Sequence, residues 1–164
     1  MQQKNKESAL SVVDARIVRF VGRHRVMTLA TADASAGGEL WCCNLFYAYL
    51  APGTLGFAGG AFVFTSPAET RHAAQFTAHG RVAASVVLES KVVGRLQGLQ
   101  LQGTVHRADS SAEWLSAARS GYLKRFPFAA PMLSELWLLE VSNMKYTDNT
   151  LGFGTKLFWP ERER

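Results

Sequence analysis

The stretch FTSPAETRHAA holds the residues best placed to do chemistry, because it sets a basic pair near the start of a predicted helix. Ser66 is a favoured N-cap, Pro67 suits the first helical position, and Glu69 would complete a capping box. Arg71 and His72 follow within the first turns, where free backbone N–H groups and the helix dipole favour an anion. Two interpretations stay open: a capping box without a ligand, or a helix start that binds a phosphate.

Other common kinds of site find little support. Cys42 and Cys43 are adjacent, so on an extended strand their side chains point to opposite faces and form neither a shared metal site nor an ordinary disulfide. The four histidines show no ligand spacing with the cysteines, and we expect no metal. No Ser-His-Asp, Cys-His or paired-carboxylate arrangement can be assembled from the sequence.

The composition is typical of a globular protein. The chain has 164 residues, 48% of them hydrophobic and 19% charged, which predicts a single domain over residues 1–164. The net charge is +5, but the basic residues are spread along the chain, so we expect no nucleic-acid partner. No apolar stretch is long enough to span a bilayer, and the polar start QQKNKES is no signal peptide. We therefore expect a cytoplasmic protein without a membrane partner.

Hydrophobic periodicity predicts three helices and six strands. The helices are an amphipathic one ending near Gly22, one from Ser66 to Gly80, and one that opens at Ser110 and fails before Pro127. The strands are Val26–Thr31, Leu40–Leu50, Phe62–Thr65, Val82–Leu88, Leu96–His106 and Leu136–Val141, with Val82–Leu88 expected to be buried. Short turns between strands favour antiparallel pairing, and several such strands favour a small closed barrel.

These residues resemble a known superfamily. A strand ending in Thr65-Ser66, then Thr70-Arg71-His72-Ala73, then RVAASVVL, is similar to the pyridoxamine phosphate oxidase-like FMN-binding split barrels. More narrowly, LATADASAGGELWCCNLFYAY, FTSPAETRHAA, LQGLQLQGTV and KYTDNTLGFGTKLFWPER look like a bacterial subgroup without an assigned function. The resemblance implies a mainly β fold with flanking helices, an antiparallel six-stranded split β-barrel. It also implies a homodimer with a flavin in a groove at each end of the subunit interface.

The resemblance assigns a phosphate site to the opening stretch. Thr65 and Ser66 would bind the FMN phosphate through hydroxyl or backbone N–H groups, and Arg71 would supply a guanidinium fork. His72 stands where the oxidase has a lysine. Because a histidine with an ordinary pKa near 6.5 is mostly neutral at pH 7, this difference weakens the expected phosphate site without abolishing it.

The flavin ring would lie along the second strand, at Asn44, Leu45 and Phe46, in contact mainly with the backbone. Asn44 reads as a buried amide whose partner is either a neighbouring strand or the flavin. Gln97 or Gln100 would match a glutamine that reaches the flavin from the dimer-related region. The sequence leaves open which of the two occupies that position. In the alternative interpretation, these glutamines simply lie on the solvent-exposed face of an antiparallel strand.

Large aromatic residues also favour a homodimer. Trp41, Phe46, Tyr47 and Trp137 offer more apolar surface than the interior of one small barrel needs.

Three functions follow from the resemblance. The first is an FMN-binding flavoprotein, an oxidoreductase that acts on an unidentified small molecule. The alternatives are a non-catalytic split-barrel dimer that holds a flavin or haem, and a structural dimer without a cofactor. The oxidase's Arg-Leu-His-like run has no match in TLGFGTKLFWPERER, so pyridoxamine phosphate oxidation itself is not expected.

Overall fold

A computed structural model describes residues 12–33 and 37–161, and its centre is one antiparallel sheet. The described strands run in the order β2-β1-β5-β6-β7-β4-β3, and β8 pairs with the far end of β7. The strands are β1 (Val26–Ala32), β2 (Leu40–Phe46), β3 (Ala48–Leu50), β4 (Ala61–Thr65), β5 (Arg81–Leu88), β6 (Gln97–Arg107), β7 (Leu136–Asp148) and β8 (Lys156–Trp159). The helices are α1 (Ala15–Arg23), α2 (Arg71–His79) and α3 (Ala112–Arg125).

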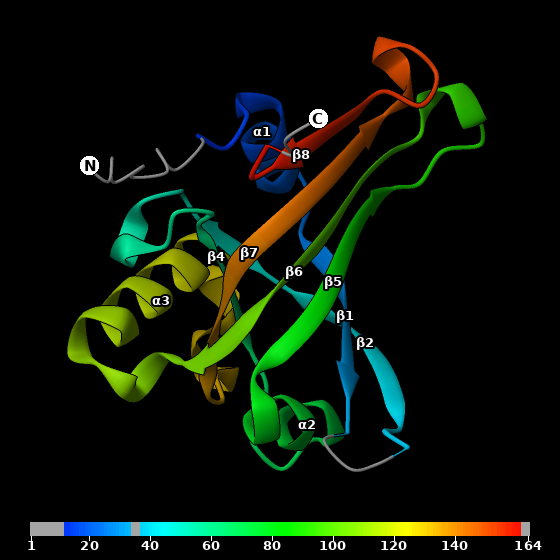
Figure 1. Cartoon of the computed structure of the whole chain (residues 1–164). Helices are drawn as coiled ribbons and strands as arrows, with labels where there is room; N and C mark the ends of the chain where they lie inside the picture. The colour runs from blue at the N-terminus through cyan, green and yellow to red at the C-terminus, as the bar shows by residue number, and fades with distance from the viewer. Residues whose placement is uncertain (1–11, 34–36, 162–164) are drawn as a thin grey trace, which may run out of the picture.

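The sheet curls into a half-barrel around its apolar side, with the helices at its margins (Figure 1). Inward side chains from β1, β5 and β6, such as Leu29, Val86 and Leu99, are buried, whereas their neighbours in sequence face outward. This is the two-residue period of a strand that is buried on one face. α1 lies at one end of β7, α2 lies at the opposite end of the sheet, and α3 covers β3 and β4.

The predicted mainly β antiparallel fold with flanking helices is confirmed, but the sheet forms a half-barrel where a small closed barrel was expected. The predicted strand Leu40–Leu50 is divided into β2 and β3 at Tyr47. There the backbone N–H of Tyr47 donates to Arg25 O at 2.9 Å, and the fully buried side chain donates its hydroxyl to Val21 O at 2.9 Å. Anchoring one aromatic residue in the core therefore bends the chain from one part of the sheet into another.

The last predicted strand was too short. β7 continues beyond Val141 to Asp148, and β8 pairs with this extension. Met144, Tyr146 and Asp148 are buried on the inward face, so the strand period persists through NMKYTD. Polar residues on both faces concealed that period in the sequence.

The strand Val82–Leu88 was predicted as buried, but β5 is buried on one face only. Val82, Ala84 and Val86 point inward, whereas Ala83 and Ser85 are partly exposed on the outward face. Small outward side chains made the segment look apolar throughout.

The β6–β7 pair contains a register shift between Gln102 and Gly103. A Cβ added at Gly103 would lie 2.0 Å from Glu140 O and 2.8 Å from Leu139 Cδ1. Only glycine lets the two backbones approach this closely.

We expect Gly103→Ala to lower the free energy of unfolding by about 1–3 kcal/mol, the usual cost of overpacking. Gly94→Ala is the matched control, because a Cβ there meets nothing within 4 Å, and we expect it to change stability by less than about 1 kcal/mol. Urea unfolding followed by tryptophan fluorescence measures both. Equal midpoints for the two variants would contradict the packing argument.

Candidate functional site

The candidate anion site begins where β4 ends. The backbone N–H of Ser66 donates to Glu135 O at 3.1 Å, and its carbonyl accepts the indole N–H of Trp137 at 2.9 Å. Ser66 is only 3% exposed. These bonds fix its backbone to the start of β7 and leave its hydroxyl to interact with α2.

The predicted helix start was wrong. α2 begins at Arg71 and is capped by Thr70, whose Oγ1 accepts the N–H of Ala73 at 3.4 Å. Ser66 cannot act as the cap because its backbone still pairs with the strand region, and Pro67 opens a turn instead. The carbonyl of Pro67 accepts the backbone N–H of Thr70 at 3.2 Å and its hydroxyl at 2.9 Å.

Two hydroxyls and one imidazole meet at this helix start. His72 Nε2 lies 2.7 Å from Ser66 Oγ and 3.2 Å from Thr70 Oγ1, and the two hydroxyl oxygens are 3.1 Å apart. Burial lowers the pKa of His72, so its ring is neutral at pH 7. This Ser66–Thr70–His72 cluster offers hydrogen bonds to an anion without a formal charge of its own.

The charge at the site comes from Arg71. Its guanidinium pairs with Glu39 Oε2 at 2.5 Å and lies 4.4 Å from the centre of the Trp41 ring. One helical turn later, Gln75 Nε2 donates to the backbone carbonyl of Glu39 at 3.1 Å. In this conformation Arg71 therefore helps α2 to hold the residue that precedes β2.

Thr65, the other predicted phosphate ligand, is engaged elsewhere. Its Oγ1 lies 2.9 Å from Ser134 Oγ and donates to Glu135 O at 3.1 Å. Its hydroxyl thus contacts the segment before β7, one residue away from the cluster.

The three predicted ring contacts on β2 divide between its two faces. Asn44 is exposed, and its Oδ1 accepts the hydroxyl of Thr28 at 2.8 Å, so the expectation of a buried amide was wrong. Leu45 packs against the core. Phe46 is 57% exposed and makes an edge contact with Phe126, with ring centres 5.5 Å apart.

Of the four aromatic residues expected to favour a dimer, Trp41 is exposed as well, whereas Tyr47 and Trp137 are buried within one chain, so that part of the expectation was wrong.

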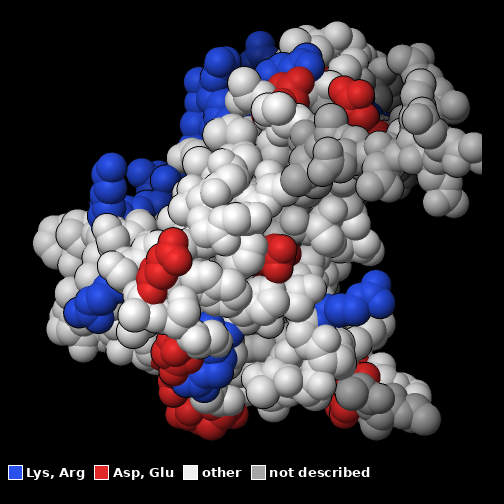
Figure 2. Space-filling view, turned by 60° about the vertical axis from the view of Figure 1, so that its left-hand side comes forward, with Lys and Arg blue, Asp and Glu red and all other residues white. Residues whose placement is uncertain are grey.

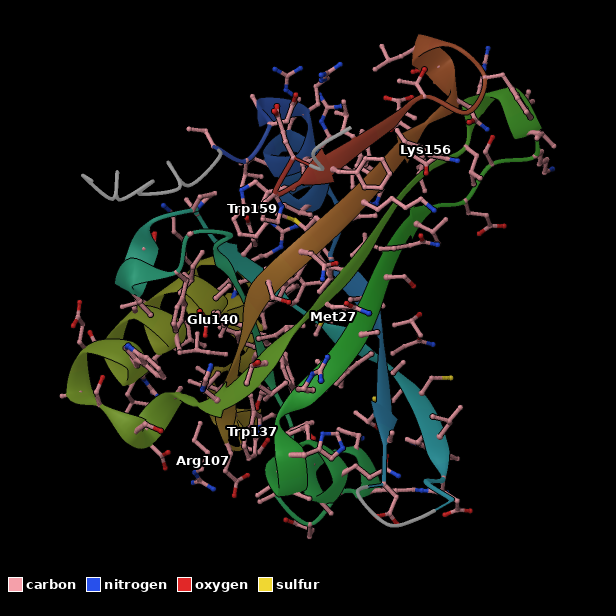
Figure 3. The ribbon with its side chains drawn as sticks, in the orientation of Figure 1. Met27, Arg107, Trp137, Glu140, Lys156 and Trp159 are labelled. Carbon is pink, nitrogen blue, oxygen red and sulfur yellow. The ribbon has the colours of Figure 1, made fainter. Side chains whose placement is uncertain are left out.

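The predicted glutamines lie far from Ser66 within one chain. Gln97 is paired with Asp148 at one end of β7, whereas Thr65 is paired with Leu136 at the other. The thirteen residues of β7 separate these ends by about 40 Å. In Figure 3, Lys156 marks the upper end of β7 and Trp137 lies near α2 at the opposite end of the sheet.

Gln100 lies on the outward face, in one row with Asn44. The row crosses β2, β1, β5 and β6 through Asn44, Thr28, Ser85 and Gln100. Three strand spacings separate its ends, which is about 14 Å. Gln97 has the opposite orientation, because its Nε2 donates to the carboxylate of Asp148 at 3.2 Å.

The outward face of this sheet is hollowed by two adjoining cavities of about 650 and 670 Å³. Both are lined by Ala30, Ala83, Gln102 and Asn143, so they form one groove across β1, β5, β6 and β7. Small side chains such as Ala30 and Ala83 create the hollow, because they project only a short distance from the sheet.

Three contributors to the site escaped the sequence analysis: Thr70 as the cap, and Glu39 and Trp41 as neighbours of Arg71. Thr70 was visible as an N-cap residue type directly before Arg71, whereas no sequence signal links residues 39 and 71.

Within the described part of the chain, no three His, Cys, Asp or Glu side chains are grouped to hold a metal ion. No helix in these ranges is long and apolar enough to cross a membrane. On the face shown in Figure 2, the basic side chains form separate groups among neutral surface.

Sequence comparison finds relatives over most of the chain. The family model for pyridoxamine 5'-phosphate oxidase matches residues 13–147. UPF0306 protein YhbP of Salmonella paratyphi A is 38% identical over 143 residues, covering 87% of this chain and 90% of the relative.

Solved structures share the fold at low identity. A haem-binding protein from Mycobacterium smegmatis superposes with a TM-score of 0.64 at 22% identity, over 82% of this chain and 52% of that one. A pyridoxamine 5'-phosphate oxidase-related, FMN-binding protein from Nostoc punctiforme superposes with a TM-score of 0.58 at 13% identity, over 87% and 82% of the two chains. The family-model match and the 38% identity to the Salmonella relative show that the chain belongs to the pyridoxamine 5'-phosphate oxidase family.

Proposed function

We propose that this protein binds FMN and serves as a flavin-dependent oxidoreductase, with the cofactor phosphate at the start of α2. The observation that carries the proposal is the convergence of two hydroxyls, an imidazole and a helix N-terminus beside Arg71. The FMN-binding relative from Nostoc punctiforme has the same fold and supports the choice of cofactor.

The donor set suits a phosphate monoester. Ser66 Oγ, Thr70 Oγ1 and His72 Nε2 lie within 3.2 Å of one another, close enough to reach the oxygens of one phosphate. The N-terminus of α2 adds backbone N–H groups and a positive dipole end. Neutral His72 can donate one hydrogen bond but brings no full charge.

Arg71 is available to such a phosphate. Its partner Glu39 has a side chain that is 76% exposed, and an exposed ion pair is worth only about 0–1 kcal/mol. A dianionic phosphate can accept bidentate hydrogen bonds from a guanidinium. These bonds are stronger than the exposed ion pair between Arg71 and Glu39. We therefore expect Arg71 to exchange Glu39 for the phosphate when FMN binds.

Bound FMN supplies the redox chemistry, and the chain's residues bind and orient it. From the Ser66–Thr70–His72 cluster, the ring would extend along β2 toward Asn44 and Phe46. Burial raises the pKa of the Cys43 thiol to about 11, so this neighbour stays protonated and is not a nucleophile at neutral pH.

We also propose a homodimer. Gln97 and Gln100 of β6 pair with the far end of β7, too far from Ser66 to share one flavin with it in the same chain. A two-fold pairing through the outward groove exchanges the two ends of the sheet, which would bring outward-facing Gln100 of a second copy toward the flavin, whereas Gln97 faces the other side of the sheet. Exposed Leu40, which lines this groove, is the kind of apolar side chain such an interface covers.

We expect Arg71→Ala to weaken FMN binding ten- to hundredfold, since a charge-assisted hydrogen bond is worth about 1.5–3 kcal/mol. His72→Lys should tighten binding at neutral pH, because lysine carries a full charge there. Titration of FMN by fluorescence quenching measures the affinities.

Two variants control this experiment. Arg119→Ala removes an exposed arginine from α3 and should leave the affinity unchanged. Glu39→Gln frees Arg71 from its ion pair and should tighten binding. Unchanged affinity in Arg71→Ala, or no binding by the natural chain, would refute the phosphate site. A haem absorption spectrum of the purified protein would show that the cofactor is haem and not FMN.

The dimer makes a separate prediction. Light scattering at micromolar concentration should give twice the chain mass of 18.0 kDa. Ala83→Arg places a long charge in the outward groove and should yield monomers, whereas Ala112→Arg on the exposed surface of α3 should leave the mass unchanged. A monomeric natural chain would rule out the shared flavin site.

A further inference from the structure

We propose that a cavity of about 500 Å³ beneath α1 binds a small organic anion, a phosphate ester or carboxylate with an apolar body. This α1 pocket is lined by Arg16, Arg19 and Arg23 on one side and by Leu88, Leu151 and Gln97 on the other. It lies at the end of β7 opposite Ser66, so it is separate from the proposed flavin phosphate site.

The helical period brings the three arginines together. Arg16, Arg19 and Arg23 are spaced three and four residues apart, so they share one face of α1. Ile17 and Val21 are buried on the other face and fix the rotation of the helix against the barrel. The basic face of α1 therefore lines the cavity. A basic face that served only solubility would need to contact nothing but water.

The pocket keeps an excess of positive charge. Arg16 is paired with Asp14 at 2.7 Å, but among the described residues Arg19 and Arg23 form no ion pair. Two guanidinium groups at the rim of one cavity thus lack a carboxylate partner within residues 12–33 and 37–161. A planar fork of this kind matches the oxygens of a phosphate or carboxylate.

The one carboxylate in the lining, Asp148, is already satisfied. Its oxygens accept hydrogen bonds from Gln97 Nε2 at 3.2 Å, Tyr146 OH at 3.1 Å, and the backbone N–H and hydroxyl of Thr150 at 2.9 and 2.6 Å. These donors hold the pKa of Asp148 below its ordinary value although burial opposes them. Asp148 therefore organises the pocket floor through neutral donors, and its single negative charge is outnumbered by the positive charges of Arg19 and Arg23.

The remaining lining predicts the body of the ligand. Phe20 is buried beside the cavity, while Leu88 and Leu151 are 38% and 52% exposed at its edge. Burial and the neighbouring Asp148 raise the pKa of Tyr146 to about 12, so its phenol remains neutral. An apolar group attached to the anion would cover these side chains and gain by their burial.

The test is calorimetric titration of the full chain with phenyl phosphate and with benzoate, and with inorganic phosphate for comparison. Each titration is repeated in Arg71→Ala, so that the flavin phosphate site does not contribute. We expect one site per chain, tighter for an organic anion than for inorganic phosphate, and a loss of at least tenfold in the double variant Arg19→Gln/Arg23→Gln. Whether phenyl phosphate or benzoate binds more tightly identifies the anionic group.

The control is Arg95→Gln/Arg119→Gln, which removes the same charge from exposed positions outside the α1 pocket. It should change the affinity less than twofold, and the thermal midpoints of both double variants should match that of the natural chain. Absence of binding at millimolar probe, or an equal loss in both double variants, would overturn the proposal. FMN affinity should be unchanged by Arg19→Gln/Arg23→Gln, so failure here is distinct from failure of the flavin site.

Discussion

The close pairing of β6 with β7 is the constraint on which the rest of the structure depends. The two strands stay paired from Gln97 opposite Asp148 to Arg107 opposite Trp137, and they pass the register shift only because Gly103 has no Cβ. On opposite sides of the shift, β7 pairs with β4 toward its start and with β8 toward its end. One long pair thus holds two chemically different ends at a fixed separation.

Much of the fold could be predicted because it rests on local patterns. The alternation of Leu99 and Leu101 with Gln100 and Gln102 in the sequence matches their burial in β6. The division at Tyr47 could not be predicted, because it depends on a hydrogen bond to Val21 from another element. The extension of β7 was hidden for a related reason, since polar Asp148 is buried only where Gln97, Tyr146 and Thr150 satisfy it.

The candidate site was less predictable than the fold, because its residues have several partners to choose from. Ser66 has the side chain of an N-cap, yet pairing of its backbone with Glu135 assigns that role to Thr70. Asn44 looked buried by its apolar neighbours in sequence, but it points to the outward face of the sheet, where Thr28 provides the partner. Residue types could be read from the sequence, whereas tertiary hydrogen bonds decide their roles.

The two ends of the sheet handle negative charge in different ways. At α2, neutral His72 and two hydroxyls bond to one another, and the single cation Arg71 is balanced by exposed Glu39. A ligand there must displace existing interactions, so its affinity is a difference between old and new bonds. At α1, Arg19 and Arg23 have no such protein partner within the described ranges, and an anion gains their charge without that loss. The first arrangement favours a large ligand with many further contacts, such as a mononucleotide, whereas the second can hold a small one.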